Sequence, residues 1–205
     1  ARLALKRGVT DYEEETWPLV RDLMKRTCDR TFFQYGGWSI EPELIRNIAL
    51  EHSKEGRMWD VWDLLTQSFI GAAMTDMAVI AERHNSPDLS SDWRRRINLL
   101  KEGIQNNLTT NHYGKQTYAE MRIPNGDAGT IYPGLGWVTL SPVAAGWEGA
   151  DRQVLKNTVQ VMNTVMVLHG CRQMVIPTND FLTKSSEKVW AGKLTLLDLR
   201  TIIAV

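Results

Sequence analysis

Apolar side chains recur every three or four residues along most of this chain, the spacing that gathers them on one face of a helix. The longest such pattern runs from residue 57 to residue 83. Its apolar positions are Trp59, Trp62, Leu65, Phe69, Ala73, Met77 and Ile80. Gly71, Ala72 and Ala73 add a smooth patch against which another helix can pack closely. We therefore predict that residues 57–83 form the central helix of the fold.

Shorter patterns of the same kind lie on both sides of this segment. They predict helices over about 11–35, 39–54, 90–106, 150–169 and 178–191, bounded by capping residues, glycines or prolines. In the second of these, Leu44, Ile45, Ile48 and Ala49 supply the apolar stripe. The chain is accordingly predicted to be mainly α, a multi-helix bundle that forms one domain over residues 1–205.

Residues 108–149 interrupt the helical pattern. The stretch from Ile123 to Gly149 holds six of the fifteen glycines and three of the seven prolines. Short strands are predicted over 117–123 and 130–140, so we expect an irregular or β-hairpin insertion. Long irregular segments in compact domains are often functional. Because aromatic rings dominate interface energetics, Tyr132, Trp137 and Trp147 are candidate partner-binding residues.

Composition narrows the class of protein only slightly. The 24 basic and 24 acidic residues cancel, so no global attraction to nucleic acid or to an anionic membrane is expected. Residues 1–9 form a basic arm and residues 193–205 an apolar tail that must pack on something. The longest uncharged helical stretch, 64–75, is about 12 residues, shorter than the roughly 20 a membrane span needs. No signal peptide is visible, which favours a cytoplasmic protein or a virion-like particle.

Local sequence motifs do not identify a class of enzyme. Those for phosphate loops, dinucleotide binding, serine hydrolysis and zinc proteolysis do not occur in the sequence. The spacing of the two cysteines and four histidines predicts no metal site, and no cofactor is expected. Arg46-Asn47 followed by His52 resembles the Arg-polar-x4-His pattern of HEPN-type helical ribonucleases. That resemblance implies RNA cleavage at a dimer interface, with Arg46 steadying phosphate and His52 transferring a proton.

The densest basic run is Arg94-Arg95-Arg96, with Lys101 further along the same predicted helix. These four residues are the candidate nucleic-acid-binding residues, since arginine and lysine neutralise phosphates. The alternative is an ordinary solvated surface whose charges are balanced by nearby acids. The remaining histidines and the cysteines are interpreted mainly as structural residues: His84, His112, His169, Cys28 and Cys171.

Together these features favour a non-enzymatic, self-assembling structural protein of coat or nucleocapsid type. It is expected to be a homo-oligomer, with contact to an RNA or DNA backbone left open. Two alternatives stand beside this prediction. One is the HEPN-like ribonuclease using Arg46 and His52, and the other is a helical bundle that binds a small ligand in a Met- and Trp-lined pocket.

Overall fold

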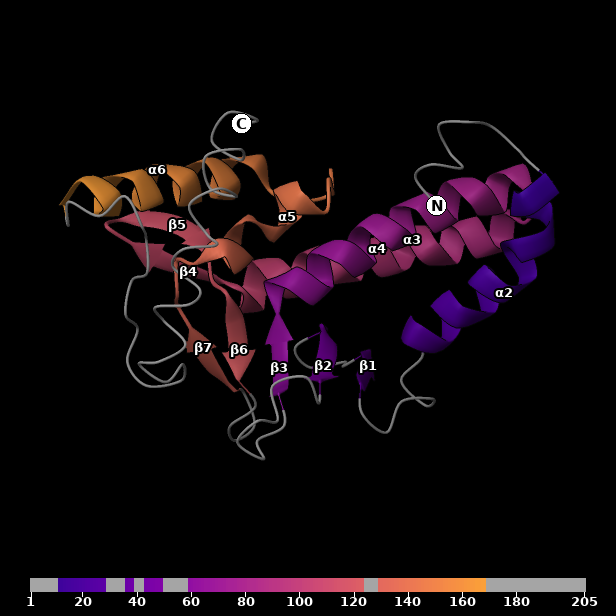
Figure 1. Ribbon diagram of the computed structural model, residues 1–205, viewed down its shortest axis with the longest axis horizontal. Coiled ribbons are helices and arrows are strands. Elements are labelled where there is room, and N and C mark those ends of the chain that lie inside the picture. The colour runs from indigo at the N-terminus through magenta and orange to yellow at the C-terminus, as the bar shows by residue number, and fades with distance from the viewer. Residues whose placement is uncertain (1–10, 29–35, 39–42, 50–58, 124–128, 169–205) are drawn as a thin grey trace.

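A computed structural model describes residues 11–28, 36–38, 43–49, 59–123 and 129–168, and these form a mainly helical molecule with a small sheet (Figure 1). The mainly α prediction is confirmed. The helices of the described part are α2 (Asp11–Cys28), α3 (Leu64–Arg83), α4 (Pro87–Asn107), α5 (Ser141–Ala144) and α6 (Arg152–Leu168).

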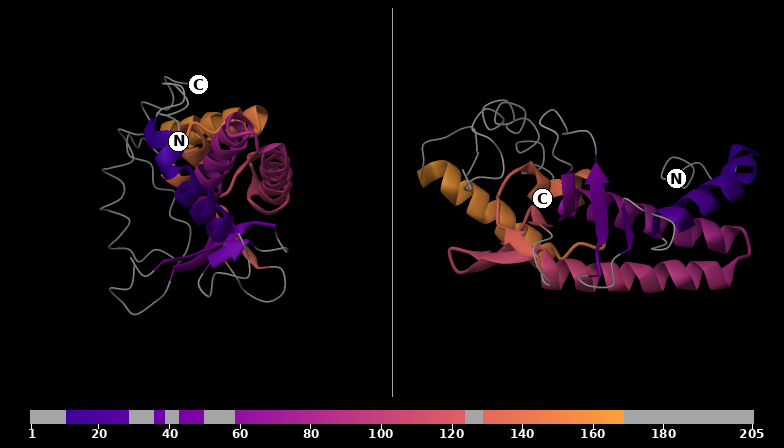
Figure 2. Two further views of the ribbon diagram at one scale, coloured as in Figure 1. Left: turned by 90° about the vertical axis from the view of Figure 1, so that its right-hand side faces the viewer. Right: turned by 90° about the horizontal axis from the view of Figure 1, so that it is seen from below.

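Helices α3 and α4 form a long antiparallel hairpin that carries the main core (Figures 1 and 2). Met74, Met77 and Ala81 of α3 are buried with Trp93 and Leu100 of α4. The turn between the helices is tight, and Asn85 adopts a left-handed conformation there with φ of 52°. Asparagine tolerates this conformation better than most residues, which suits it to this position.

The central helix begins later than its apolar pattern predicts. Residues 59–63 form strand β3 (Trp59–Asp63), and α3 starts at Leu64 because Asp63 caps it. The Asp63 carboxylate accepts a hydrogen bond from the backbone amide of Thr66 at 2.6 Å. The predicted boundary at residue 57 is therefore wrong by one short strand. Trp59 and Trp62, three residues apart, match a helical spacing, although they belong to a strand.

The helix predicted over residues 39–54 is also wrong. Its centre is strand β2 (Ile45–Ala49), which pairs with β1 (Gly36–Trp38) on one side and with β3 on the other. Ile45 and Ile48 are β-branched residues that favour strands, and pairing on both edges overrides the helical spacing of the stripe.

Two hairpins occupy part of the predicted insertion. Strands β4 (Thr109–His112) and β5 (Lys115–Tyr118) are joined by a two-residue turn in which Tyr113 and Gly114 have φ of 51° and 75°. Strands β6 (Met121–Ile123) and β7 (Thr130–Tyr132) form the second hairpin. Because β6 also pairs with β3, the sheet order is β1-β2-β3-β6-β7, and this hairpin completes the main sheet.

The remaining insertion residues fold against the helical hairpin. The predicted strand over 130–140 ends at Tyr132, and residues Trp137–Leu140 form a 3-10 helix followed by α5. Helix α6 then packs along β5, where Thr158 accepts a hydrogen bond from the backbone amide of Tyr118 at 2.9 Å. Trp147 lies against Gly71 of α3, so the smooth patch receives an indole ring.

Several predictions concern residues outside the described ranges: the basic arm 1–9, His52, the helix over 178–191, and the tail 193–205. Among the described residues, α3 has the length and hydropathy of a membrane span. However, 61% of that window is buried inside the protein, and the core helix of a water-soluble protein passes the same test.

Candidate functional site

Glu120 is the most unusual carboxyl group of the described chain. It lies between β5 and β6, where its backbone carbonyl accepts a hydrogen bond from the amide of Leu64, the first residue of α3. This bond fixes the residue at the junction of the sheet and the central helix. The side chain is only 8% exposed.

The two oxygens of this carboxyl group are held differently. Oε1 accepts a hydrogen bond from the backbone amide of Gly136 at 2.5 Å. No described residue donates a hydrogen bond to Oε2. Burial raises the pKa of Glu120 to about 7, and the Gly136 hydrogen bond lowers it only in part.

Two glycines give this carboxyl group its space. A Cβ atom at Gly134 would lie 2.7 Å from Oε1 of Glu120, and one at Gly136 would overlap the same oxygen. Tyr132 also flanks Gly134, because a Cβ atom at Gly134 would lie 2.8 Å from the Cε1 atom of Tyr132. The glycines of the predicted insertion thus form a close-fitting wall around one protonatable group.

Asp63, the neighbouring buried acid on β3, shows what a structural carboxylate looks like in this fold. One oxygen accepts from the Thr66 amide, and the other accepts from Asn47 Nδ2 at 2.8 Å and from the Thr66 hydroxyl at 3.0 Å. Both oxygens are therefore committed to holding the chain. In Glu120, by contrast, only Oε1 accepts a hydrogen bond from a described residue.

The ribonuclease-like pair is not brought together within the described chain. Arg46 lies on strand β2, with its guanidinium 5.6 Å from the ring centre of Trp62, a cation–π contact. His52 falls outside the described residues. The helix that was expected to present both side chains is absent at residues 45–49, where the chain is a strand.

The predicted nucleic-acid-binding arginines are each engaged within the chain. Arg94 pairs with Glu82 of α3 at 2.7 Å, and Arg95 and Arg96 pair with Asp92 at 2.7 and 2.9 Å. Burial opposes ionisation of Asp92, but these arginine hydrogen bonds outweigh it and lower its pKa. Arg96 also donates to the carbonyl of Cys28 at 3.0 Å and so joins α4 to the end of α2.

Lys101 lies at the edge of a cavity of about 330 Å3. Among the described residues, its lining includes Glu102, Gln105, Tyr118 and Trp147 but no methionine. The cavity thus differs in composition from the Met- and Trp-lined pocket that the sequence suggested.

Two of the three predicted partner-binding aromatics are buried in this fold. Tyr132 and Trp147 are 8% and 5% exposed. Trp147 packs between α3 and the turn at Gly149, which holds the segment on the helical body. Trp137 begins the 3-10 helix, and the position of its side chain lies outside the described structure.

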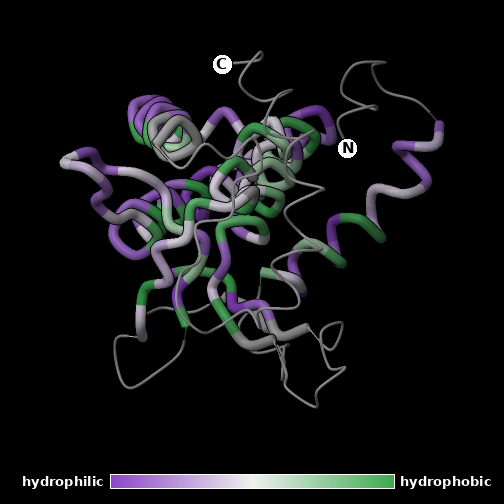
Figure 3. The backbone as a smooth tube through the Cα atoms, turned by 60° about the vertical axis from the view of Figure 1, so that its left-hand side comes forward, coloured by the Kyte–Doolittle hydropathy of each residue, from purple (hydrophilic) through white to green (hydrophobic). Residues whose placement is uncertain are grey.

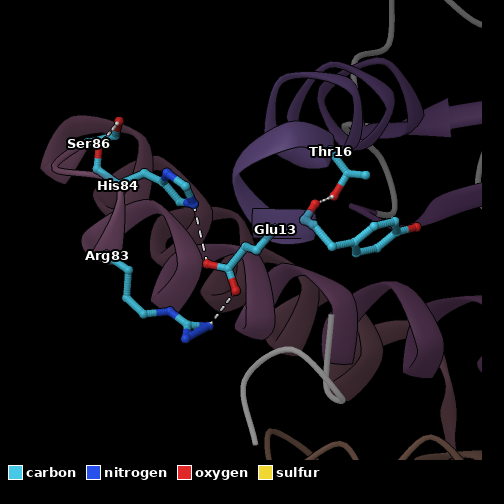
Figure 4. Close-up of polar contacts among 6 residues, drawn as sticks. Glu13, Thr16, Arg83, His84 and Ser86 are labelled. Atoms are coloured by element: carbon cyan, nitrogen blue, oxygen red, sulfur yellow. Dashed lines mark hydrogen bonds and ion pairs between the residues drawn. The ribbon is translucent and has the colours of Figure 1, made fainter. Parts of the chain in front are cut away.

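A further buried acid, Glu13, joins α2 to the end of α3 (Figure 4). Its carboxylate contacts Arg83 Nη2 at 3.0 Å and His84 Nε2 at 3.3 Å. The ring of His84 stacks on Trp17 with 4.8 Å between ring centres. Because both Glu13 oxygens face basic side chains at the end of α3, we interpret this cluster as a structural link.

The other polar candidates are also structural. His112 Nδ1 shares a hydrogen bond with the Thr117 hydroxyl at 2.8 Å, and burial lowers its pKa, so the neutral ring braces the β4–β5 hairpin. Burial raises the pKa of the Cys28 thiol to about 12, which makes it a poor nucleophile. Among the described residues, no three His, Cys, Asp or Glu side chains group as metal ligands.

Sequence reasoning did not identify Glu120. The only signal available was a single acid within the apolar run 118–121, just before the glycine-rich segment. Comparisons with family models, curated proteins and solved structures returned no match for this chain.

Proposed function

We propose that this protein is an enzyme in which Glu120 acts as the general acid or base on an uncharged substrate. The observation that supports this most is the asymmetric carboxyl group, with one oxygen held by the Gly136 amide and the other unpaired. A general acid or base is most effective when its pKa lies near the working pH. The raised pKa of Glu120, about 7, meets that requirement.

The surroundings favour an uncharged substrate. Ionised Glu120 would repel an anionic group brought beside it, and that charge would raise the pKa of Glu120 further, whereas an uncharged substrate adds no such charge. Protonated Glu120 can donate to a leaving group, and ionised Glu120 can take a proton from an attacking water. Nitrophenyl glycosides and carboxylic esters are neutral probes for both kinds of step.

The direct test compares Glu120→Gln with Glu148→Gln, because Glu148 is exposed, lies outside the cavity lining and serves as a matched control. Glutamine keeps the size of the side chain and an acceptor for the Gly136 amide but cannot transfer a proton. We expect wild type and the control to turn over at least one neutral probe, and Glu120→Gln to lose about 100-fold or more of that rate. Equal rates in all three proteins would refute the proposal.

A second test of the proposed role of Glu120 needs no substrate. Carboxyl carbon resonances, followed by NMR during a pH titration, report the pKa of each glutamate separately. We expect one resonance, absent in Glu120→Gln, to titrate near pH 7. Titration of that resonance near pH 4.5 would remove the basis for the proposed chemistry.

The coat-type assembly role stays a prediction, as does binding to a nucleic-acid backbone. The ion pairs of Arg94, Arg95 and Arg96 and the burial of Trp147 do not favour the contacts first expected of them. The expected homo-oligomer has support of a different kind, because three large apolar residues of α2 are exposed.

A further inference from the structure

Helix α2 carries an apolar stripe on its solvent side. Tyr12, Leu19 and Leu23 are 71%, 66% and 59% exposed. They stand seven and four residues apart, so at 3.6 residues per turn they lie along one line of the helix. Single exposed apolar residues are ordinary, but three aligned on one side of the same helix form an apolar contact surface.

The stripe is separate from the face that α2 turns toward the body. Glu13, Trp17 and Cys28 are buried, and Val20 and Met24 pack partly against the main core. Helix α2 runs along one edge of the molecule, with hydrophobic and hydrophilic segments alternating along it (Figures 1 and 3). One face therefore holds α2 in place, and the other face is available to a partner.

The charges beside the stripe indicate what that partner is. Glu15 flanks its amino-terminal part, and Arg26, which pairs with Asp22, flanks its carboxyl-terminal part. When two copies of α2 run antiparallel, Leu19 of each copy meets Leu23 of the other. Glu15 then lies beside Arg26 across the pair, twice by symmetry. In a parallel arrangement the flank that carries Glu15 and Arg26 would instead face the opposite flank of the partner helix, where Thr16 and Thr27 lie, and these charge pairs would not form.

We propose that the α2 stripe is the interface of a symmetric antiparallel dimer of this chain. The two helix dipoles oppose each other in this arrangement, which adds to the attraction. A stripe of three apolar residues is small compared with standard interfaces of about 800 Å2 per partner. The dimer is therefore weak and forms at high protein concentration.

Sedimentation equilibrium over a concentration series tests the apolar part of the interface. Wild type is expected to shift from monomer to dimer as concentration rises, and Leu23→Glu to raise the dissociation constant about tenfold or more. Phe69→Glu is the matched control, since Phe69 is 51% exposed on α3. A wild type that stays monomeric, or a Leu23→Glu variant that dimerises normally, would overturn the proposal.

A charge exchange tests the antiparallel arrangement. Glu15→Lys alone and Arg26→Glu alone each place like charges across the pair, so each is expected to weaken self-association. Mixing the two variants restores opposite charges on both sides, and a heterodimer is expected. Circular dichroism of each variant establishes that α2 is still folded. If folded variants fail to associate on mixing, the antiparallel dimer is ruled out.

Discussion

Glu120 holds its proton over a pH range in which most carboxyl groups of an unfolded chain have lost theirs. Its pKa rises from 4.5 to about 7 on folding, so the native state binds more protons than the unfolded state between these values. Stability therefore falls as pH rises through this window, by about 2–3 kcal/mol from this one group. Glu120→Gln should remove that loss. Urea unfolding at pH 5 and pH 8 measures it, and an unchanged pH dependence would contradict it.

Gly71 is a position where one added methyl group is expected to lower the stability of the fold. A Cβ atom there would lie 2.5 Å from Cε2 of Trp147, inside the contact distance of any carbon pair. Alanine normally improves a helix by up to about 1 kcal/mol relative to glycine. Here we expect Gly71→Ala to lose about 1–3 kcal/mol, because the clash displaces the ring. Thermal unfolding measures the loss, and adding Trp147→Phe should recover part of it.

At the scale of elements, the start of α3 depends on Asp63. Its carboxylate caps the helix at Thr66 and holds Asn47 of β2, so one side chain joins two elements. We expect Asp63→Ala to destabilise the protein by about 2 kcal/mol, and Asp63→Asn to keep most of the stability. Ser86, at the start of α4, makes no capping bond from its side chain. Ser86→Ala should therefore be nearly neutral, and equal losses at both caps would contradict this account.

The elements that the sequence predicts best are the long ones. Helices α3, α4 and α6 each repeat their apolar spacing over several turns, and such a pattern has few competing interpretations. Strand β2 is too short for this, because Leu44, Ile45, Ile48 and Ala49 fit one helical turn as well as a strand. Only pairing with β1 and β3 decides between them, and that information lies in distant residues.

The candidate site was missed for a similar reason. What makes Glu120 unusual is its burial beside Gly134 and Gly136, which a local pattern cannot reveal. The basic run was correctly located on a helix, but its ion pair with Glu82 depends on the packing of α4 on α3. Asp92 lies three and four residues before Arg95 and Arg96, so helical spacing alone accounts for those two ion pairs.

At the scale of the whole molecule, α2 is held at two points. Glu13 joins Arg83 and His84 near its start, and the Cys28 carbonyl accepts from Arg96 at its end. We expect Glu13→Gln to cost about 1–3 kcal/mol, since the Arg83 guanidinium loses its charged partner. Hydrogen exchange should become faster in α2 while the α3–α4 hairpin stays protected. Glu14→Gln is the exposed control, and uniform exchange throughout would contradict a local role.

The order of strands in the sheet has a consequence for how the molecule folds. Strands β3 and β6 are neighbours, yet the whole α3–α4 hairpin lies between them in the chain. Closing so long a loop directly would cost considerable entropy, whereas the helical hairpin forms through contacts that are close in sequence. Once formed, it brings its two ends together and aligns both strands. We therefore expect the helical hairpin to fold first and to serve as the template on which the sheet assembles.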